Sequence, residues 1–267
     1  MTLLHLLLIA VIQGITEFLP ISSSGHLILL PKLTGMQDQG LTIDVAVHVG
    51  TLAAVILYFR KDVAMALAGL GRLLRGRIDT PGAFLALCLV VATIPVIVLG
   101  LIVEVTGLAD AMRSVAVIGW TMLIFGIVLW WFDLKSPTGR KAPGWTLKHA
   151  AVMGLWQALA LIPGTSRSGI TITAARALGY ARPDAARLSM LMSIPTILAS
   201  GALLGLKVVA DADLVAAREG AIAAFFAFGS ALLALAVMMR LARSITFTPY
   251  VIYRVILGVV LLGYAYL

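Results

Sequence analysis

Cysteine and charge are both scarce in this chain of 267 residues. Its one cysteine, Cys88, lies in an apolar run, which excludes a disulfide framework and a cysteine-based zinc site. Charged residues make up only 12% and hydrophobic residues 61%, against about 25% and about 45–50% in soluble globular domains. This composition excludes a soluble enzyme and a disordered chain, and it predicts a polytopic membrane protein.

The charge that is present is mostly positive, with a formal net charge of +8. In a soluble protein this excess would indicate a nucleic-acid partner. In a membrane protein it is typical of lysine and arginine gathered in cytoplasmic loops that face anionic lipid, so we expect the bilayer, and no nucleic acid, as a partner. The apolar run Leu3–Ile12 has no lysine or arginine before it and no small-residue cleavage site after it, and we interpret it as mature sequence.

Six apolar stretches are long enough to cross a bilayer, which takes about 20 helical residues. They are Leu41–Phe59, Ala83–Val103, Ser114–Phe132, Arg187–Val208, Gly220–Met239 and Pro249–Leu267. Two further apolar runs, Leu3–Leu19 and His149–Pro163, each lead into a proline and a small polar cluster, and a shorter apolar piece follows. This pattern is typical of a re-entrant, broken helix, which enters the membrane and returns to the same side. We therefore expect an all-α polytopic membrane protein with six transmembrane helices and two re-entrant broken helices, forming one integral membrane domain over residues 1–267.

The distribution of positive charge predicts how these spans are oriented. Placing the loop Arg60–Gly82 in the cytoplasm puts fourteen of the twenty lysines and arginines inside and leaves four in the outside loops. This asymmetry satisfies the positive-inside rule. Both termini are then expected outside, with the first re-entrant segment open to the outside and the second open to the inside.

The two broken segments align without a gap, Gln13–Gly25 over Gln157–Gly169, and three spans follow each of them. An odd number of spans per half makes the two halves, about 1–132 and 149–267, inverted repeats in the membrane. Inverted repeats whose broken helices meet near the midplane are found in secondary transporters, where the breaks mark the binding site. A chance likeness of two Ser/Gly turns is the alternative, and the shared register, length and following topology argue against it.

A carboxylate lies at the inner end of the first apolar run. Glu17 is preceded four residues earlier by Gln13, which shares its helix face. A charged side chain at bilayer depth costs on the order of 2.5–3.5 kcal/mol on insertion scales, so such residues are functional by default. The alternative for Glu17 is a helix-end carboxylate exposed to water.

A serine-rich cluster follows Glu17 in the sequence. Ser22, Ser23 and Ser24 supply hydroxyls, Gly25 a flexible turn and His26 an imidazole. Ser23 and His26 are three residues apart and can meet if Gly25 opens a helix. A serine beside a base is the arrangement of an activated nucleophile, whereas an ordinary helix cap is the alternative.

The second cluster contains a single basic residue, Arg167, between Ser166 and Ser168 at the start of a predicted half-helix. Free backbone N–H groups at a helix N-terminus, together with hydroxyls and a guanidinium, form an anion site that suits phosphate best. The alternative is an arginine that pairs with Glu17 to stabilise the fold, and the two roles are compatible.

Three further polar residues are expected to have mainly structural roles. Asp44 and His48 lie four residues apart at the outer end of a predicted span, where structural or interfacial roles are favoured. Arg254 in the last span is expected to reach the interface or to form a pair.

Three motifs together resemble one known family. QGITE at Gln13–Glu17, PISSSGH at Pro20–His26 and PGTSRSG at Pro163–Gly169 are similar to the motifs of the undecaprenyl-diphosphatase family of the bacitracin-resistance (BacA) type. The resemblance covers the whole chain in length, number of spans and motif spacing. The catalytic residues it implies are Glu17, Ser23, His26 and Arg167. The residues expected to bind the substrate phosphates are Gln13, Ser22, Ser24, Gly25, Ser166, Ser168, Gly169 and Thr171.

The resemblance implies removal of the terminal phosphate from a C55 polyprenyl diphosphate, which recycles the lipid carrier for cell-wall synthesis and confers resistance to bacitracin. It also implies a location in the bacterial cytoplasmic membrane, with the active site facing the outside, and a homodimer is one assembly to be considered. Either Ser23 or His26 would attack phosphorus or activate the attacking group.

A divalent cation, Mg²⁺ or Ca²⁺, is the cofactor to be expected. Because the first motif position is Gln13 rather than glutamate, one acid fewer is available to hold a metal. Glu17 would therefore be a weak ligand, and the substrate phosphates would provide most of the others.

Two other classes of function compete with the enzyme. The inverted repeat and its central breaks favour a secondary transporter or lipid flippase. A non-enzymatic protein that binds a lipid carrier is the other alternative. Against both, an acid, a nucleophile, a base and a phosphate-binding arginine exceed what transport or binding requires.

Overall fold

The computed structural model describes residues 1–35, 37–211 and 214–267, and this part of the chain is helical apart from its connections. Six of its helices are long and apolar enough to cross a membrane. They are α3 (Gly40–Tyr58), α5 (Pro81–Val105), α7 (Val115–Lys135), α10 (Arg182–Asp211), α11 (Leu214–Leu241) and α12 (Thr248–Tyr266). Each contains most of one predicted span, so the prediction of six spans is confirmed.

Local sequence signals explain where these helices begin. Thr80 caps α5 by accepting a hydrogen bond from the backbone N–H of Ala83, and Pro81 occupies the first helical position. Ser114 caps α7 in the same way. Many of the large apolar side chains on these helices are exposed, including Val90 and Ile94 of α5, as expected of surfaces that face lipid.

The segment 60–82, expected to be a loop, is largely helical. Helix α4 (Arg60–Leu73) packs against the start of α5, and Gly69 permits this contact because a Cβ there would lie 2.0 Å from the Gly82 carbonyl carbon. The short helices α6 (Leu108–Met112) and η1 (Ala142–Gly144) were not predicted either. Helix α4 was missed because it is too polar to be read as a span, and α6 and η1 were missed because they are only five and three residues long.

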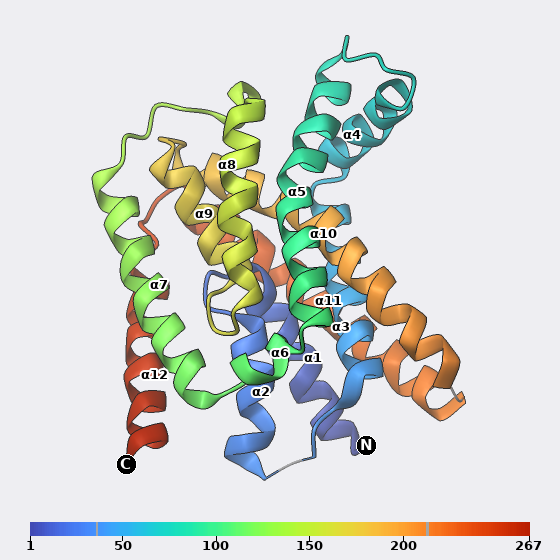
Figure 1. The fold of residues 1–267 in the computed structure, drawn as a ribbon, viewed down its shortest axis with the longest axis vertical. Helices are drawn as coiled ribbons and strands as arrows, with labels where there is room; N and C mark the ends of the chain where they lie inside the picture. Colours follow the sequence, from blue (N-terminus) through green and yellow to red (C-terminus); the bar gives the residue numbers. More distant parts are fainter. Residues whose placement is uncertain (36, 212–213) are drawn as a thin grey trace.

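Both predicted breaks are present. The first separates α1 (Leu3–Phe18) from α2 (Ser23–Thr34). The second separates α8 (Leu147–Ala158) and the 3₁₀ turn η2 (Leu159–Leu161) from α9 (Arg167–Ala177). Figure 1 shows that α1 and α2 extend from their break toward the end of the molecule that carries both termini, whereas α8 and α9 extend toward the opposite end. The two breaks therefore meet near the middle of the structure.

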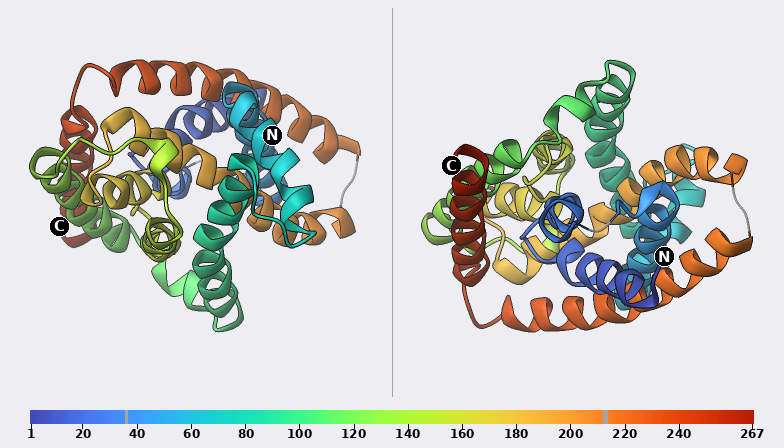
Figure 2. Two further views of the ribbon diagram at one scale, coloured as in Figure 1. Left: turned by 90° about the horizontal axis from the view of Figure 1, so that it is seen from above. Right: turned by 90° about the horizontal axis from the view of Figure 1, so that it is seen from below.

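The long helices pack against these broken elements. Helix α7 packs along α12, and α11 packs along both α3 and α1. In both views of Figure 2, α2 and α9 lie near the centre of the bundle, with α7 and α12 on one side of them, whereas α8 lies at the rim between α5 and α7. Close helix contacts rely on glycine, since a Cβ on Gly50 would lie 2.2 Å from the Ala224 carbonyl oxygen. The polar clusters are thus held in the interior of an apolar bundle.

Candidate active site

The two breaks have the same backbone geometry. Ser22 has φ 74° and Ser166 has φ 70°, and in the described part of the chain they are the only residues other than glycine with positive φ. Each is the N-cap of the helix that follows, and its Oγ accepts a hydrogen bond from the backbone N–H three residues on, of Gly25 or Gly169. Such backbone conformations cost about 1–3 kcal/mol and cluster at functional sites. The aligned serines and glycines are therefore equivalent in conformation as well as in sequence.

Hydrogen bonds tie the two breaks to each other. The Ser168 hydroxyl donates to the Leu19 carbonyl oxygen at 2.9 Å. Arg254, which was expected to reach the interface or pair with an acid, is instead fully buried. Its guanidinium donates to backbone carbonyls of both breaks and of α7, those of Pro20, Gly164, Thr165, Thr121 and Met122. One arginine on α12 thus fixes both loops that carry the motifs.

Glu17 is the centre of the polar cluster. Its Oε1 accepts a hydrogen bond from Arg167 Nη2 at 2.7 Å. Its Oε2 accepts from Ser23 Oγ at 2.6 Å and from Gln13 Nε2 at 2.9 Å, and His48 Nε2 lies 3.8 Å from the same oxygen. The carboxylate is 8% exposed, and hydrogen-bonded partners offset the cost of burying its charge. The structure therefore brings together the acid, the serine and the arginine that the sequence singled out.

These groups line a cavity of about 220 Å³ where α1, α2, α3 and α9 converge, here called the site cavity. Its polar lining consists of Glu17, Ser22, Ser23, Ser24, His48, Ser166, Arg167, Thr196 and Ser200. Val96, Ala160, Leu161 and Ile197 complete the wall with apolar surface. Because α9 begins at Arg167, its N-terminal turn opens beside the cavity, where helix N–H groups attract anions. The site cavity can therefore accept a phosphate next to an apolar group.

His26 lies away from this cavity. Its Nδ1 is 2.6 Å from the Ser22 carbonyl oxygen, and its Nε2 is 2.6 Å from the hydroxyl of Tyr253, on which the imidazole also stacks. The expected pairing of Ser23 with His26 is not present, because the Ser23 hydroxyl points to Glu17 on α1. The two side chains are bound to partners on different helices, since Ser23 contacts Glu17 of α1 and His26 contacts Tyr253 of α12. His26 thus connects the first break to α12.

Several predicted phosphate ligands are engaged with the protein itself. Gln13 holds Glu17, and Ser168 holds Leu19, as described above. Thr171 Oγ1 donates to the Arg167 carbonyl oxygen and lies 2.6 Å from Ser189 Oγ. The N–H groups of Gly25 and Gly169 are used by the caps. A Cβ on Gly169 would lie 2.8 Å from Arg254 Nη1, so this glycine provides space rather than a contact.

Sequence reasoning missed the importance of His48, Tyr253 and Ser189. His48 was assigned with Asp44 to structural or interfacial roles, yet it lines the site cavity. The Asp44 carboxylate accepts a hydrogen bond from Gln39 Nε2, and only its backbone carbonyl contacts His48. Polar residues within otherwise apolar helices were the available signal, and it could not indicate which of them face the breaks.

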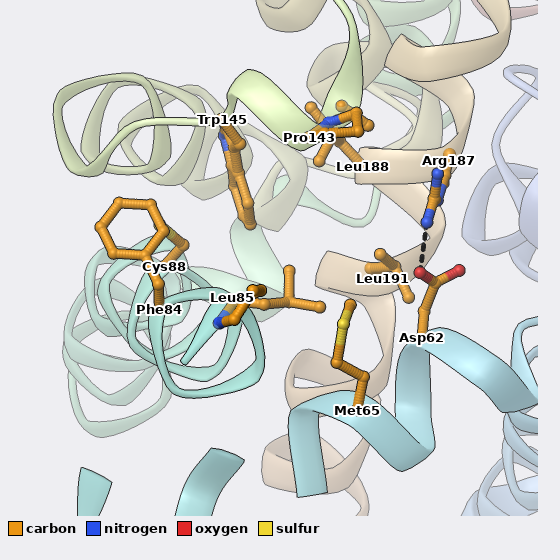
Figure 3. A pocket seen from close by; sticks show the side chains of 12 residues that line it. Asp62, Met65, Phe84, Leu85, Cys88, Pro143, Trp145, Arg187, Leu188 and Leu191 are labelled. Atoms are coloured by element: carbon orange, nitrogen blue, oxygen red, sulfur yellow. Dashed lines mark hydrogen bonds and ion pairs between the residues drawn. The ribbon is translucent and has the colours of Figure 1, made fainter. Parts of the chain in front are cut away.

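A second cavity, of about 320 Å³, is lined by residues of α4, α5, α10 and the segment around η1 (Figure 3). Asp62 of α4 and Arg187 of α10 form an ion pair at its edge. Trp145 and apolar side chains of α5 and α10 form most of the remaining lining. None of the motif residues lines it, so the chemistry suggested by the sequence belongs to the site cavity.

The residues at the site do not form a metal centre by themselves. Across the described ranges, no three His, Cys, Asp or Glu side chains are grouped so that they could hold an ion. Both Glu17 oxygens already accept hydrogen bonds from protein groups. The donor set therefore does not fit a cation bound by the protein alone.

An apolar bundle of membrane-crossing length, with a buried polar cavity suited to an anion, defines a multi-pass membrane protein with an internal ionic site. Comparison with known proteins points to one family. The family model described as Bacitracin resistance protein BacA matches residues 6–260, and the chain belongs to this family. A protein of Dinoroseobacter shibae named undecaprenyl-diphosphatase is 73% identical over the full length of both chains. A protein of the same name from Roseobacter denitrificans is 68% identical over the full length of both chains. Another, from Saccharophagus degradans, is 48% identical over 97% of this chain and 96% of the other.

Proposed function

We propose that this protein is a membrane phosphatase that hydrolyses undecaprenyl diphosphate to undecaprenyl phosphate and inorganic phosphate. The observation that carries the proposal is the buried Glu17, bonded through one oxygen to Arg167 and through the other to Ser23. The names of full-length relatives support the same substrate. Recycling of the lipid carrier and resistance to bacitracin follow from this activity, because bacitracin sequesters the diphosphate.

Ser23 is the nucleophile that the geometry favours over His26. Its hydroxyl lies 2.6 Å from Glu17 Oε2, which is positioned to accept the proton, whereas both nitrogens of His26 are occupied outside the cavity. Ser23 Oγ attacks the terminal phosphorus and its proton passes to Glu17. The bond from phosphorus to the bridging oxygen breaks, and undecaprenyl phosphate leaves with the bonding electrons.

Arg167 and the first turn of α9 supply the charge stabilisation. Phosphoryl transfer depends mainly on positioning and on neutralising negative charge on the phosphate oxygens. Arg167 is already placed beside the serine through their shared partner Glu17. A terminal phosphate in the site cavity would contact the guanidinium and the N–H groups of the helix end, together with the hydroxyls of Ser24 and Ser166.

A divalent cation would reach this site with the substrate, bound mainly through its phosphate oxygens. The motive is that Gln13 contributes an amide and that Glu17 is engaged by protein donors. We expect Mg²⁺ or Ca²⁺ to bind measurably tighter to the protein with a non-hydrolysable lipid diphosphate analogue than without it. Equal binding in a calorimetric titration of both samples would contradict this proposal.

Re-entry of the two broken elements and inversion of the two halves remain part of the proposal. They are supported by the matched break geometry and by the opposite directions of the two helix pairs (Figure 1). The charge distribution supports termini and active-site mouth on the outer face of the cytoplasmic membrane. A homodimer is compatible with this arrangement, and cross-linking in native membranes would test it.

Phosphate release by the purified protein in detergent separates this function from its alternatives. The same matched breaks favour a transporter or flippase, which would move the lipid without releasing phosphate, and a carrier-binding protein would release none either. We expect release of one phosphate for each undecaprenyl diphosphate consumed. A pure preparation that binds the lipid diphosphate but releases no phosphate would contradict the proposal.

A further inference from the structure

His48 is held in a defined orientation toward the site cavity. Its Nδ1 lies 2.6 Å from the backbone carbonyl oxygen of Asp44, one turn earlier in α3. A carbonyl oxygen can only accept a hydrogen bond, so Nδ1 carries the hydrogen and the neutral ring keeps a lone pair on Nε2. Nε2 lies 3.8 Å from Glu17 Oε2, and the side chain lines the cavity.

The imidazole of His26, which lies in the first motif cluster, differs from that of His48 because both of its nitrogens have hydrogen-bond partners. The same reasoning places the hydrogen of His26 on Nδ1, because that atom contacts the Ser22 carbonyl oxygen. Nε2 of His26 then accepts a hydrogen bond from the Tyr253 hydroxyl. Within the described residues, no hydrogen-bond donor contacts Nε2 of His48. The available imidazole lone pair at the cavity therefore belongs to His48.

The proposed reaction needs a second proton acceptor. In the first half, the Ser23 proton moves to Glu17, which can then no longer serve as a base. Hydrolysis of the phosphoserine requires a water molecule to lose a proton as it attacks phosphorus. Glu17 must at the same time return its proton to Ser23 as the bond between Oγ and phosphorus breaks.

We infer that His48 is the base that accepts the proton of this water, a role that rests on the proposed phosphatase function. Water attacks the phosphorus of phosphoserine and forms a new oxygen–phosphorus bond, while its proton passes to His48 Nε2. The bond between Ser23 Oγ and phosphorus breaks, and Oγ recovers its proton from Glu17. Phosphate then leaves, and His48 releases its proton to phosphate or solvent, which restores the starting state.

The test follows both products of undecaprenyl diphosphate labelled in its terminal phosphate. In His48→Gln, undecaprenyl phosphate should appear in a burst of about one per enzyme. Steady release of phosphate should then be about 10²–10⁴-fold slower than in the wild type, with label retained on Ser23. Imidazole added to His48→Ala should restore part of the phosphate release, which a purely structural role would not allow.

Two matched histidine variants act as controls. His26→Gln should slow both products equally and retain no label, because His26 contacts the break and not the cavity. His149→Gln, at the far end of the molecule, should behave as the wild type. Wild-type kinetics in His48→Gln, or equal slowing of both products without retained label, would overturn the inference. A wild-type protein that releases no phosphate would instead refute the proposed function.

Discussion

Glu17 and Arg167 are separated by 150 positions in the sequence, yet their side chains form an ion pair with 2.7 Å between Oε1 and Nη2. Glu17 lies in the last turn of α1 and Arg167 is the first residue of α9, so the pair joins the two breaks across the centre of the molecule. The pair connects the acid that faces Ser23 to the helix end that attracts phosphate. Activation of Ser23 and binding of the phosphate therefore both depend on the contact between Glu17 and Arg167.

Replacing Arg167 with lysine should be nearly as damaging as replacing it with alanine. The guanidinium spans two partners, with Nη2 on Glu17 and Nη1 directed to the Ser189 carbonyl oxygen. It can also present a planar fork to phosphate, which a point-like ammonium cannot reproduce. Phosphate release by the purified Arg167→Lys and Arg167→Ala proteins tests this. A lysine variant within a few-fold of the wild type would refute the claim.

Glu17 and Gln13 should respond very differently to substitution. Glu17→Gln removes the one acid in contact with Ser23 and should abolish turnover. Gln13→Ala removes only the amide that holds Glu17 and should cost about 10–100-fold, as for residues that orient a metal or active-site ligand. Gln13→Glu should retain activity, because the family motif that this sequence resembles has glutamate or glutamine at the position of Gln13. Substantial turnover in Glu17→Gln with loss in Gln13→Ala would show that the two roles are reversed.

Gly164 should tolerate no side chain. It has φ 87°, and a Cβ would lie 2.2 Å from Thr121 Oγ1, which donates to the neighbouring carbonyl of Pro163. Gly164→Ala should therefore lower the thermal midpoint in detergent by roughly 5 °C or more and reduce turnover. Gly139→Ala is the matched control, because nothing lies within 4 Å of its Cβ position. Equal midpoints for the two variants would contradict this account of the second break.

The orientation proposed for the membrane is open to a direct test. With both termini outside, a C-terminal alkaline phosphatase fusion should be active and a C-terminal green fluorescent protein fusion should be dark. The physical reason is the excess of lysine and arginine in the loops at the opposite end. The reverse pattern would place the first motif on the cytoplasmic side.

Much of the fold could be predicted because membrane spans are encoded locally. Composition and run length gave six spans, and the prolines and small residues at Pro20 and Pro163 gave both breaks. The amphipathic helix α4 was missed because its charged residues, such as Arg60 and Arg72, made it resemble a loop. Its helical state depends on packing against α5, which the sequence does not show directly.

Only those site residues that belong to the sequence motifs could be predicted. Glu17, Ser23 and Arg167 stood out as polar residues at the breaks, and the structure brings them together. His48 and Arg254 could not be assigned, because each acts on a break from another helix. Which face of a long helix meets a distant loop is decided by tertiary packing, which leaves no local signal in the sequence.

The most direct test of the central claim is phosphate release from undecaprenyl diphosphate by Ser23→Ala, measured beside the wild type and Ser24→Ala. Ser23 donates to Glu17, whereas the Ser24 hydroxyl contacts only Ser22 at 3.4 Å among the hydrogen bonds of the site. The account predicts a loss on the order of 10³-fold or more for Ser23→Ala and a much smaller loss for Ser24→Ala. Turnover by Ser23→Ala close to that of the wild type would contradict it.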